Sequence, residues 1–175
     1  MRPAPGRASL KGATRLLLNW PEIYALFDGR TPLLTDCGAL CGHACCQGGP
    51  HDGMPLFPGE KARFAGADWC RVFTQGDMDI LVCEGACPRD MRPLFCRLFP
   101  AMVYTNGTRM RLRLNPLARG VCPLAQEHLR ALDPAFLEAC RLAAARVCAD
   151  EAGRAFIARY SRLVDEAFDC ALFRA

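Results

Sequence analysis

Four cysteines and one histidine lie within ten residues, in the segment Cys37–Cys46. The thiols recur at every fourth residue from Cys37 to Cys45, and Cys46 follows directly. Most of the intervening residues are glycine or alanine, which let the backbone turn tightly. Thiolates bind zinc at roughly 2.3 Å and also hold iron–sulfur clusters, so several of them must converge on one point. The spacing therefore predicts a loop that wraps a metal ion or a cluster.

A second group of cysteines follows downstream. It contains Cys83, Cys87 and Cys96, and Cys122 lies further along the chain. A tetrahedral site needs four ligands, so eight thiols exceed what a single ion can use. Two alternatives stay open: two sites, or one site of four thiolates with the other thiols spare. The candidate ligands are Cys37, Cys41, Cys45, Cys46, Cys83, Cys87, Cys96 and Cys122.

The adjacent pair Cys45 and Cys46 bears on this choice. In an extended backbone adjacent side chains point to opposite sides, so the pair would serve two neighbouring sites. In a tight turn both thiolates would bind one ion. His43 is a weaker candidate for a zinc ligand, because a solvent-exposed or hydrogen-bonding loop histidine explains its position slightly better.

Two arginines flank Cys96 and are candidate cofactor-binding residues. Arg92 precedes this cysteine by one helical turn, and Arg97 follows it directly. A four-thiolate zinc site carries a charge of about −2 by simple counting. A guanidinium beside the sulfurs would donate hydrogen bonds to them and offset that charge. The alternative for each is an ordinary surface arginine.

The Arg-Pro-x-x-Cys segment ending at Cys96 has too few cysteines for a closed site of its own. We therefore expect at least one centre to draw thiolates from both cysteine groups. The sulfur of Cys41 or Cys45 should then lie within about 7 Å of that of Cys96, the span of a single cluster. The four other cysteines fall in strand-like or helical patterns and are expected to act as small apolar side chains. They are Cys70, Cys140, Cys148 and Cys170.

The bulk composition favours a cytoplasmic location. The 175 residues include twelve cysteines but no secretory signal pattern, and no stretch approaches the ~20 apolar residues of a membrane span. Reduced cysteine clusters in the cytoplasm more often bind metal than form disulfides; a disulfide-rich exported protein is the alternative. The net charge of +4 is modest, and no basic segment is interleaved with aromatic residues. We therefore expect neither nucleic acid nor a membrane as a partner.

Hydrophobic periodicity predicts a mainly α fold with a minor β component. A small cysteine-rich metal-binding centre with short hairpins should pack against an α-helical carboxyl-terminal half. Residues 1–12 are expected to be flexible, and residues 13–175 to form a single domain. The predicted helices are 13–27, which Pro21 should break or restart, then 58–67, 123–132, 133–150 and 153–171. The predicted hairpins pair 69–74 with 78–83 and, across Asn106-Gly107, 101–105 with 108–114.

Three motifs follow one another in this chain. The loop Cys37–Cys46 precedes the apolar-plus-glutamate segment Met54–Glu60, and Cys87–Pro100 then contains Arg-Pro-x-x-Cys-Arg-x-Phe-Pro. The succession resembles the YkgJ-type cysteine-cluster family of zinc- or iron-chelating domains, over about residues 37–122. The resemblance implies thiolate binding of zinc or a [4Fe-4S] cluster. The cysteine pattern is also similar to part of flagellin lysine-N-methylase, a longer protein that looks like an iron–sulfur enzyme.

Three functions remain in competition. The first is a metal-binding protein whose centre is structural or serves an unknown protein or small-molecule partner. The second, which rests on family analogy, is an iron–sulfur enzyme with a protein lysine methylase-like or redox activity. The third is metal sensing or delivery. The sequence contains no nucleotide-binding glycine loop and no hydrolase triad order, so whether the protein is an enzyme stays open.

Overall fold

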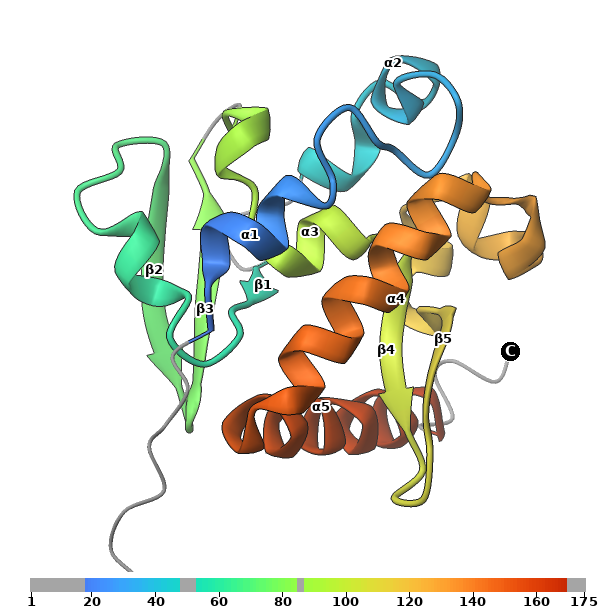
Figure 1. Cartoon of the computed structure of the whole chain (residues 1–175). Coiled ribbons are helices and arrows are strands. Elements are labelled where there is room, and N and C mark those ends of the chain that lie inside the picture. The colour runs from blue at the N-terminus through green and yellow to red at the C-terminus, as the bar shows by residue number, and fades with distance from the viewer. Residues whose placement is uncertain (1–17, 48–52, 85–86, 170–175) are drawn as a thin grey trace, which may run out of the picture.

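The computed structural model describes residues 18–47, 53–84 and 87–169 (Figure 1). The segment 1–12, expected to be flexible, lies outside these residues. The first described helix, α1, spans Trp20–Ala25. Asn19 caps it by accepting a hydrogen bond from the backbone N–H of Glu22, and Pro21 occupies its first turn. Pro21 therefore lies at the start of this helix, in agreement with the predicted restart there. Residues 13–17 of the predicted helix lie outside the described residues.

Both predicted hairpins are confirmed. β2 (Cys70–Gln75) pairs antiparallel with β3 (Met78–Cys83), and the short β1 (Met54–Pro55) pairs with the other edge of β3. β4 (Ala101–Thr105) pairs with β5 (Met110–Leu114) in a separate sheet. β5 begins two residues later than predicted because the Asn106 side chain accepts hydrogen bonds from the backbone of Thr108 and Arg109, which holds them in the loop.

Two long helices form the carboxyl-terminal part. α4 (Pro134–Ala149) starts where predicted, with Asp133 accepting a hydrogen bond from the backbone N–H of Phe136 at 2.8 Å. α5 spans Glu151–Asp169 and packs against β4 and α4. Figure 1 shows α4 descending onto α5, with β4 and β5 beside them. None of the described helices is long and apolar enough to span a bilayer.

The predicted helix at 123–132 is wrong. The segment forms two 3-10 turns, Pro123–Gln126 and Leu129–Ala131, separated by the extended residue Glu127. A helix of ten residues gains too few hydrogen bonds to repay its nucleation without a strongly buried face. The backbone N–H of Asp133 instead donates to the carbonyl of Pro32, which ties this segment to the loop after α1.

The prediction of a mainly α fold is also wrong. About half of the described residues are helical when 3-10 turns are included, and about 17% lie in strands, so the fold is a small α+β fold with two sheets. Apart from α4 and α5, the helices described are one or two turns long. Short apolar runs that periodicity assigns to helices are stopped early here by proline, glycine and tight turns.

The main apolar core joins α1, α3 (Leu94–Leu98), β4, α4 and α5. At its centre, the ring of Phe57 lies 4.9 Å from those of both Phe95 and Phe156. α3 directs Leu94, Phe95 and Leu98 into this core, where each is at most 5% exposed. Cys96, on the same helix, is only partly buried and lines a cavity. Packing of α3 therefore fixes the position of one candidate ligand.

Candidate metal centres

The first cysteine loop is built from two short turns. α2 (Cys37–Cys41) is a single helical turn, capped by Asp36, whose side chain accepts from the backbone N–H of Gly38 at 3.1 Å. Cys37 and Cys41 share one face of this turn, because residues four apart are neighbours on a helix. Gly42 ends the helix in the left-handed region, and the 3-10 turn Ala44–Cys46 follows. The reversal carries Cys45 and Cys46 back toward the other thiols.

His43 lies against the helix backbone. A Cβ on Gly38 would be only 2.4 Å from the His43 Nδ1, so the imidazole needs glycine at this position. His43 has a φ of 57° and is exposed. This placement fits a loop histidine.

Two thiols of the second group lie on a strand and a helix that pack within the fold. Cys83 ends β3, opposite Cys70 in the ladder with β2, and Cys96 lies on α3. An ion pair of 2.9 Å between Arg89 and Asp36 ties this region to the cap of α2. Both partners are about half exposed, so we expect this pair to contribute only about 0.2–1 kcal/mol to stability.

Glu60 fixes the start of α3. This fully buried carboxylate accepts hydrogen bonds from the backbone N–H of Leu94 at 2.6 Å and of Phe57 at 2.9 Å, and from the Tyr24 hydroxyl. Pro93, the residue before α3, offers no capping side chain. Glu60 satisfies the free N–H instead. Burial raises the pKa of Glu60, while its three donors lower it.

The thiols group into two sets of four, both by the cavity that only the first set lines in full and by the charges that the thiols exert on one another. In the first quartet, burial raises the pKa of Cys37, and the neighbouring charges of Cys45, Cys122 and Cys41 raise it further. Burial also raises the pKa of Cys122, and the charges of Cys45 and Cys41 raise it further. The first quartet is therefore Cys37, Cys41, Cys45 and Cys122.

The second quartet centres on Cys87. Hydrogen bonds from Cys46 and Cys83 lower the pKa of Cys87, and Arg92 lowers it further. Cys46 and Cys83, as the partners that keep their protons, have raised pKa values. Burial raises the pKa of Cys96, followed by the charge of Cys87. The second quartet is Cys46, Cys83, Cys87 and Cys96.

The two quartets meet at the adjacent cysteines. The sulfurs of Cys45 and Cys46 are 3.9 Å apart. The hydrogen-bond contact between these sulfurs, in which either can be the donor, lowers the pKa of Cys45 to about 6. Cys45 also interacts electrostatically with Cys37 and Cys122 of its own quartet and with Cys87 and Cys96 of the other, so it lies at the boundary between them. Each quartet thus combines thiols that are far apart in sequence.

The two candidate arginines are placed differently. Burial lowers the pKa of Arg92, but its hydrogen bond to Cys87 and the charges of Cys46, Cys87 and Cys96 outweigh this and raise it. Arg97 instead donates to the backbone carbonyls of Arg92 at 2.8 Å and Tyr24 at 3.3 Å, and lies 4.3 Å from the centre of the Tyr24 ring. Arg92 therefore faces the thiols, whereas the donors of Arg97 are engaged by the backbone.

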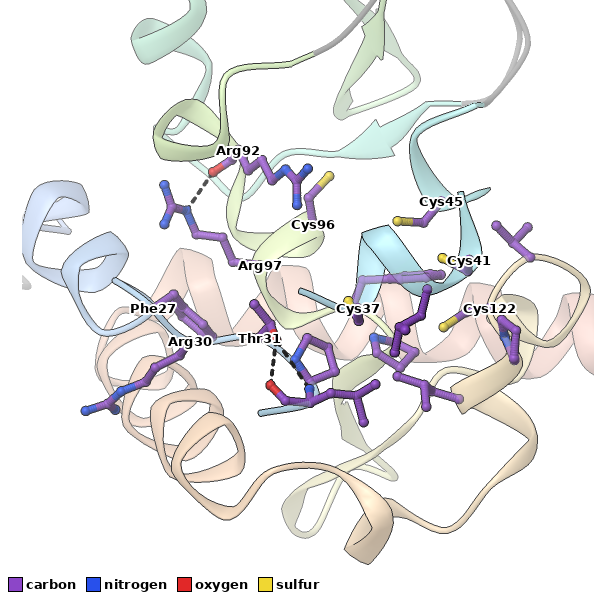
Figure 2. A pocket seen from close by; sticks show the side chains of 18 of the residues that line it. Phe27, Arg30, Thr31, Cys37, Cys41, Cys45, Arg92, Cys96, Arg97 and Cys122 are labelled. Carbon is purple, nitrogen blue, oxygen red and sulfur yellow. Dashed lines mark hydrogen bonds between the residues drawn. The ribbon is translucent and has the colours of Figure 1, made fainter. Parts of the chain in front are cut away.

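A cavity of about 230 Å³ lies beside the first quartet (Figure 2). All four of its thiols line this cavity, and Cys96 is the only member of the second quartet that does. The opposite wall is largely apolar and includes Phe27, Leu33 and Phe99. In Figure 2 the sulfur of Cys45 points toward the side of Cys96. The first quartet therefore adjoins the cavity with all of its thiols, and the second with Cys96 alone.

The sulfurs of neither quartet are already arranged around a metal position. In the part of the chain that the structure describes, no three Cys, His, Asp or Glu side chains form a ready metal site. The thiol side chains would have to move together to bind an ion. The donor sets still fit one, because four thiolates are a common tetrahedral set. The Nε of Arg92 supports the fit, since it is buried with no acceptor among the described residues and a bound thiolate or sulfide would supply one.

Of the cysteines expected to be structural, Cys140 and Cys148 lie away from the two quartets, whereas Cys70 lies beside Cys83. Cys140 and Cys148 lie on α4 and contact the main core, and burial raises the pKa of Cys140 to about 12. Cys70 is buried in a small cluster with Leu56 and Leu81, yet faces Cys83 across the sheet. Cys170 lies outside the described residues. The roles of Glu60, Tyr24 and the Arg89–Asp36 pair were not predictable from the sequence, because they depend on contacts between distant segments.

Comparison with known proteins gives no match: no protein-family model, no curated protein and no solved structure is significantly similar to this chain.

Proposed function

We propose that this protein binds metal through two thiolate centres, one in each quartet, holding zinc or iron–sulfur clusters. The observation that carries the proposal is the division of eight thiols from distant segments into two neighbouring sets of four. Four is the number of thiolates that a closed zinc site or a [4Fe-4S] cluster takes. This arrangement favours the two-site alternative over a single site with spare thiols.

The surrounding residues have defined tasks in this proposal. Arg92 donates to the Cys87 sulfur and offsets part of the thiolate charge of the second quartet. Glu60 holds the first turn of α3 and so positions Cys96. Arg97 pins α3 to α1 through the Tyr24 carbonyl and ring. When bound, zinc would supply structural cross-linking and a cluster would add electron transfer.

An iron–sulfur enzyme is the second candidate function, with a redox or protein lysine methylase-like activity. The cavity beside the first quartet favours it, because a reactive centre needs space for a substrate whereas a structural one is closed. The cavity is smaller than the ~300–1,000 Å³ of most small-molecule sites. The metal-binding function therefore has the stronger support.

The resemblance to the YkgJ-type family and a cytoplasmic location belong to the same proposal. The resemblance rests on the order of the three motifs in Cys37–Pro100. A reducing compartment would keep the thiols available as ligands, and the eleven cysteines in the described part of the chain are free thiols.

Anaerobic purification of the full chain, followed by metal and acid-labile sulfide analysis, tests the proposal. Zinc centres predict about two ions per chain and no sulfide. Iron–sulfur centres predict a brown protein that absorbs near about 400 nm and contains iron and sulfide in similar amounts. Cys140→Ser is the matched control and should keep the full metal content. A folded, reduced chain that takes up neither zinc nor iron would overturn the proposal.

A further inference from the structure

Two thiols of the second quartet, Cys83 and Cys96, are anchored in regular structure, whereas Cys46 shares the 3-10 turn of Cys45. Cys83 belongs to the central strand of the three-stranded sheet, and Cys96 to the helix whose first N–H is capped by buried Glu60. The core side chains of α3, Phe95 among them, hold the same helix from the other side. Ligands on such elements cannot move far without disturbing the core.

The first quartet is anchored much less firmly. Two of its thiols lie on the single turn α2, and Cys45 lies on a three-residue 3-10 turn and is exposed. The residues next to its ligands are also exposed, since Leu40 beside Cys41 is 71% exposed and Val121 beside Cys122 is 45% exposed. Both side chains line the cavity that the quartet opens into.

From this contrast we propose that the first quartet is an exchange site for thiophilic metal ions such as Zn²⁺, while the second quartet retains its ion. This inference rests on the proposed two-centre function and adds a division of labour between the centres. A small thiol that enters the cavity would take the ion over, and an acceptor protein that presents thiols would use the same route.

Cys45 is the ligand expected to leave first. It is the one exposed thiol among the eight candidates, all of which the structure describes. In the exchange, the incoming thiol loses its proton to water as its sulfur binds the ion. The Cys45 sulfur then dissociates and takes up a proton from water. The ion changes one thiolate for another, with no change in oxidation state and no net proton release.

Competition with a chromogenic chelator tests this inference on the full chain, reduced and loaded with zinc. We expect release in two phases of one ion each, differing in rate by at least about tenfold. Added β-mercaptoethanol should speed the fast phase alone. Cys122→Ser should remove the fast phase and keep the slow one, and Cys83→Ser should do the reverse.

Two results would overturn the inference: release of both ions in one phase, or loss of the fast phase in Cys83→Ser with the slow phase intact. A chain that binds no zinc would instead contradict the proposed function itself. Should Cys83→Ser not fold, ¹¹³Cd NMR of the unsubstituted chain decides. Added thiol should broaden one of two cadmium resonances, and equal broadening of both would contradict the inference.

Discussion

The carboxyl-terminal helices and the cysteine region keep their shapes by different means. α4 and α5 bury a continuous set of apolar side chains, including the fully buried Phe136 and Val164. The cysteine loop Cys37–Cys46 contributes no side chain to the main core and is held by a helix cap, a left-handed glycine and one exposed ion pair. The contrast teaches that the helical part can fold without metal, whereas the cysteine region needs its ligands to close around an ion.

Metal removal should produce the largest difference between the two regions. Because binding free energy is also folding free energy at thiolate centres, a chelator under reducing conditions should unfold the segment around Cys37–Cys46. The core side chains of α3 should keep Cys96 in place. α4 and α5 should remain helical. Amide hydrogen exchange measures this directly, with protection lost around Cys37–Cys46 and kept in α4 and α5. Equal loss of protection in both regions would show that they are not independent.

Phe136→Ala tests the contribution of the helical core. Phe136 is fully buried on α4, with its ring 6.3 Å from that of Phe27. The substitution should destabilise the fold by about 3–5 kcal/mol in denaturant unfolding. Metal content below the unfolding transition should stay unchanged, since none of the eight candidate ligands belongs to the core cluster around this ring. Loss of metal from the folded variant would contradict the separation of the two regions.

The two quartets should also respond to pH. Cys46, Cys83 and Cys96 have raised pKa values in the metal-free chain, so they hold protons at neutral pH and must release them to bind an ion. Affinity should therefore rise with pH and fall on acidification, by about tenfold per pH unit for each proton released. Zinc competition titrations between about pH 6 and pH 8 measure the slope. An affinity independent of pH would mean that the thiols are already ionised.

A smaller effect is expected for Glu60→Gln. An amide cannot accept hydrogen bonds on both sides, so one of the three donors around Glu60 loses its acceptor, at a cost of about 1–3 kcal/mol. Since Glu60 positions α3, the second quartet should lose about 10–100-fold in zinc affinity and the first quartet should not. Leu98→Ala, on the same helix, controls for general destabilisation of α3. Equal weakening of both quartets would assign Glu60 a role in folding alone.

The sequence predicted which thiols are candidate ligands, but it did not predict how they are grouped. Hairpins and the α4 start were predictable because Asn106-Gly107 and Asp133-Pro134 are strong local signals. Whether Cys45 and Cys46 serve one site or two was not predictable from the sequence. Their placement depends on a 3-10 turn set by left-handed Gly42 and His43. Glu60 lies within the apolar-plus-glutamate motif, but its role requires contacts with Tyr24 and Leu94, far away in the sequence. Local patterns do not report such long-range hydrogen bonds.

The central claim is that adjacent Cys45 and Cys46 serve different centres, and native mass spectrometry of zinc-loaded chains tests it most directly. Cys45→Ser and Cys46→Ser should each remove one ion, and the double variant both. Cys45→Ser combined with Cys122→Ser should remove only one, because these residues share a quartet. A chain that holds one ion, or a Cys45/Cys46 double variant that loses no more than either single variant, would contradict the account.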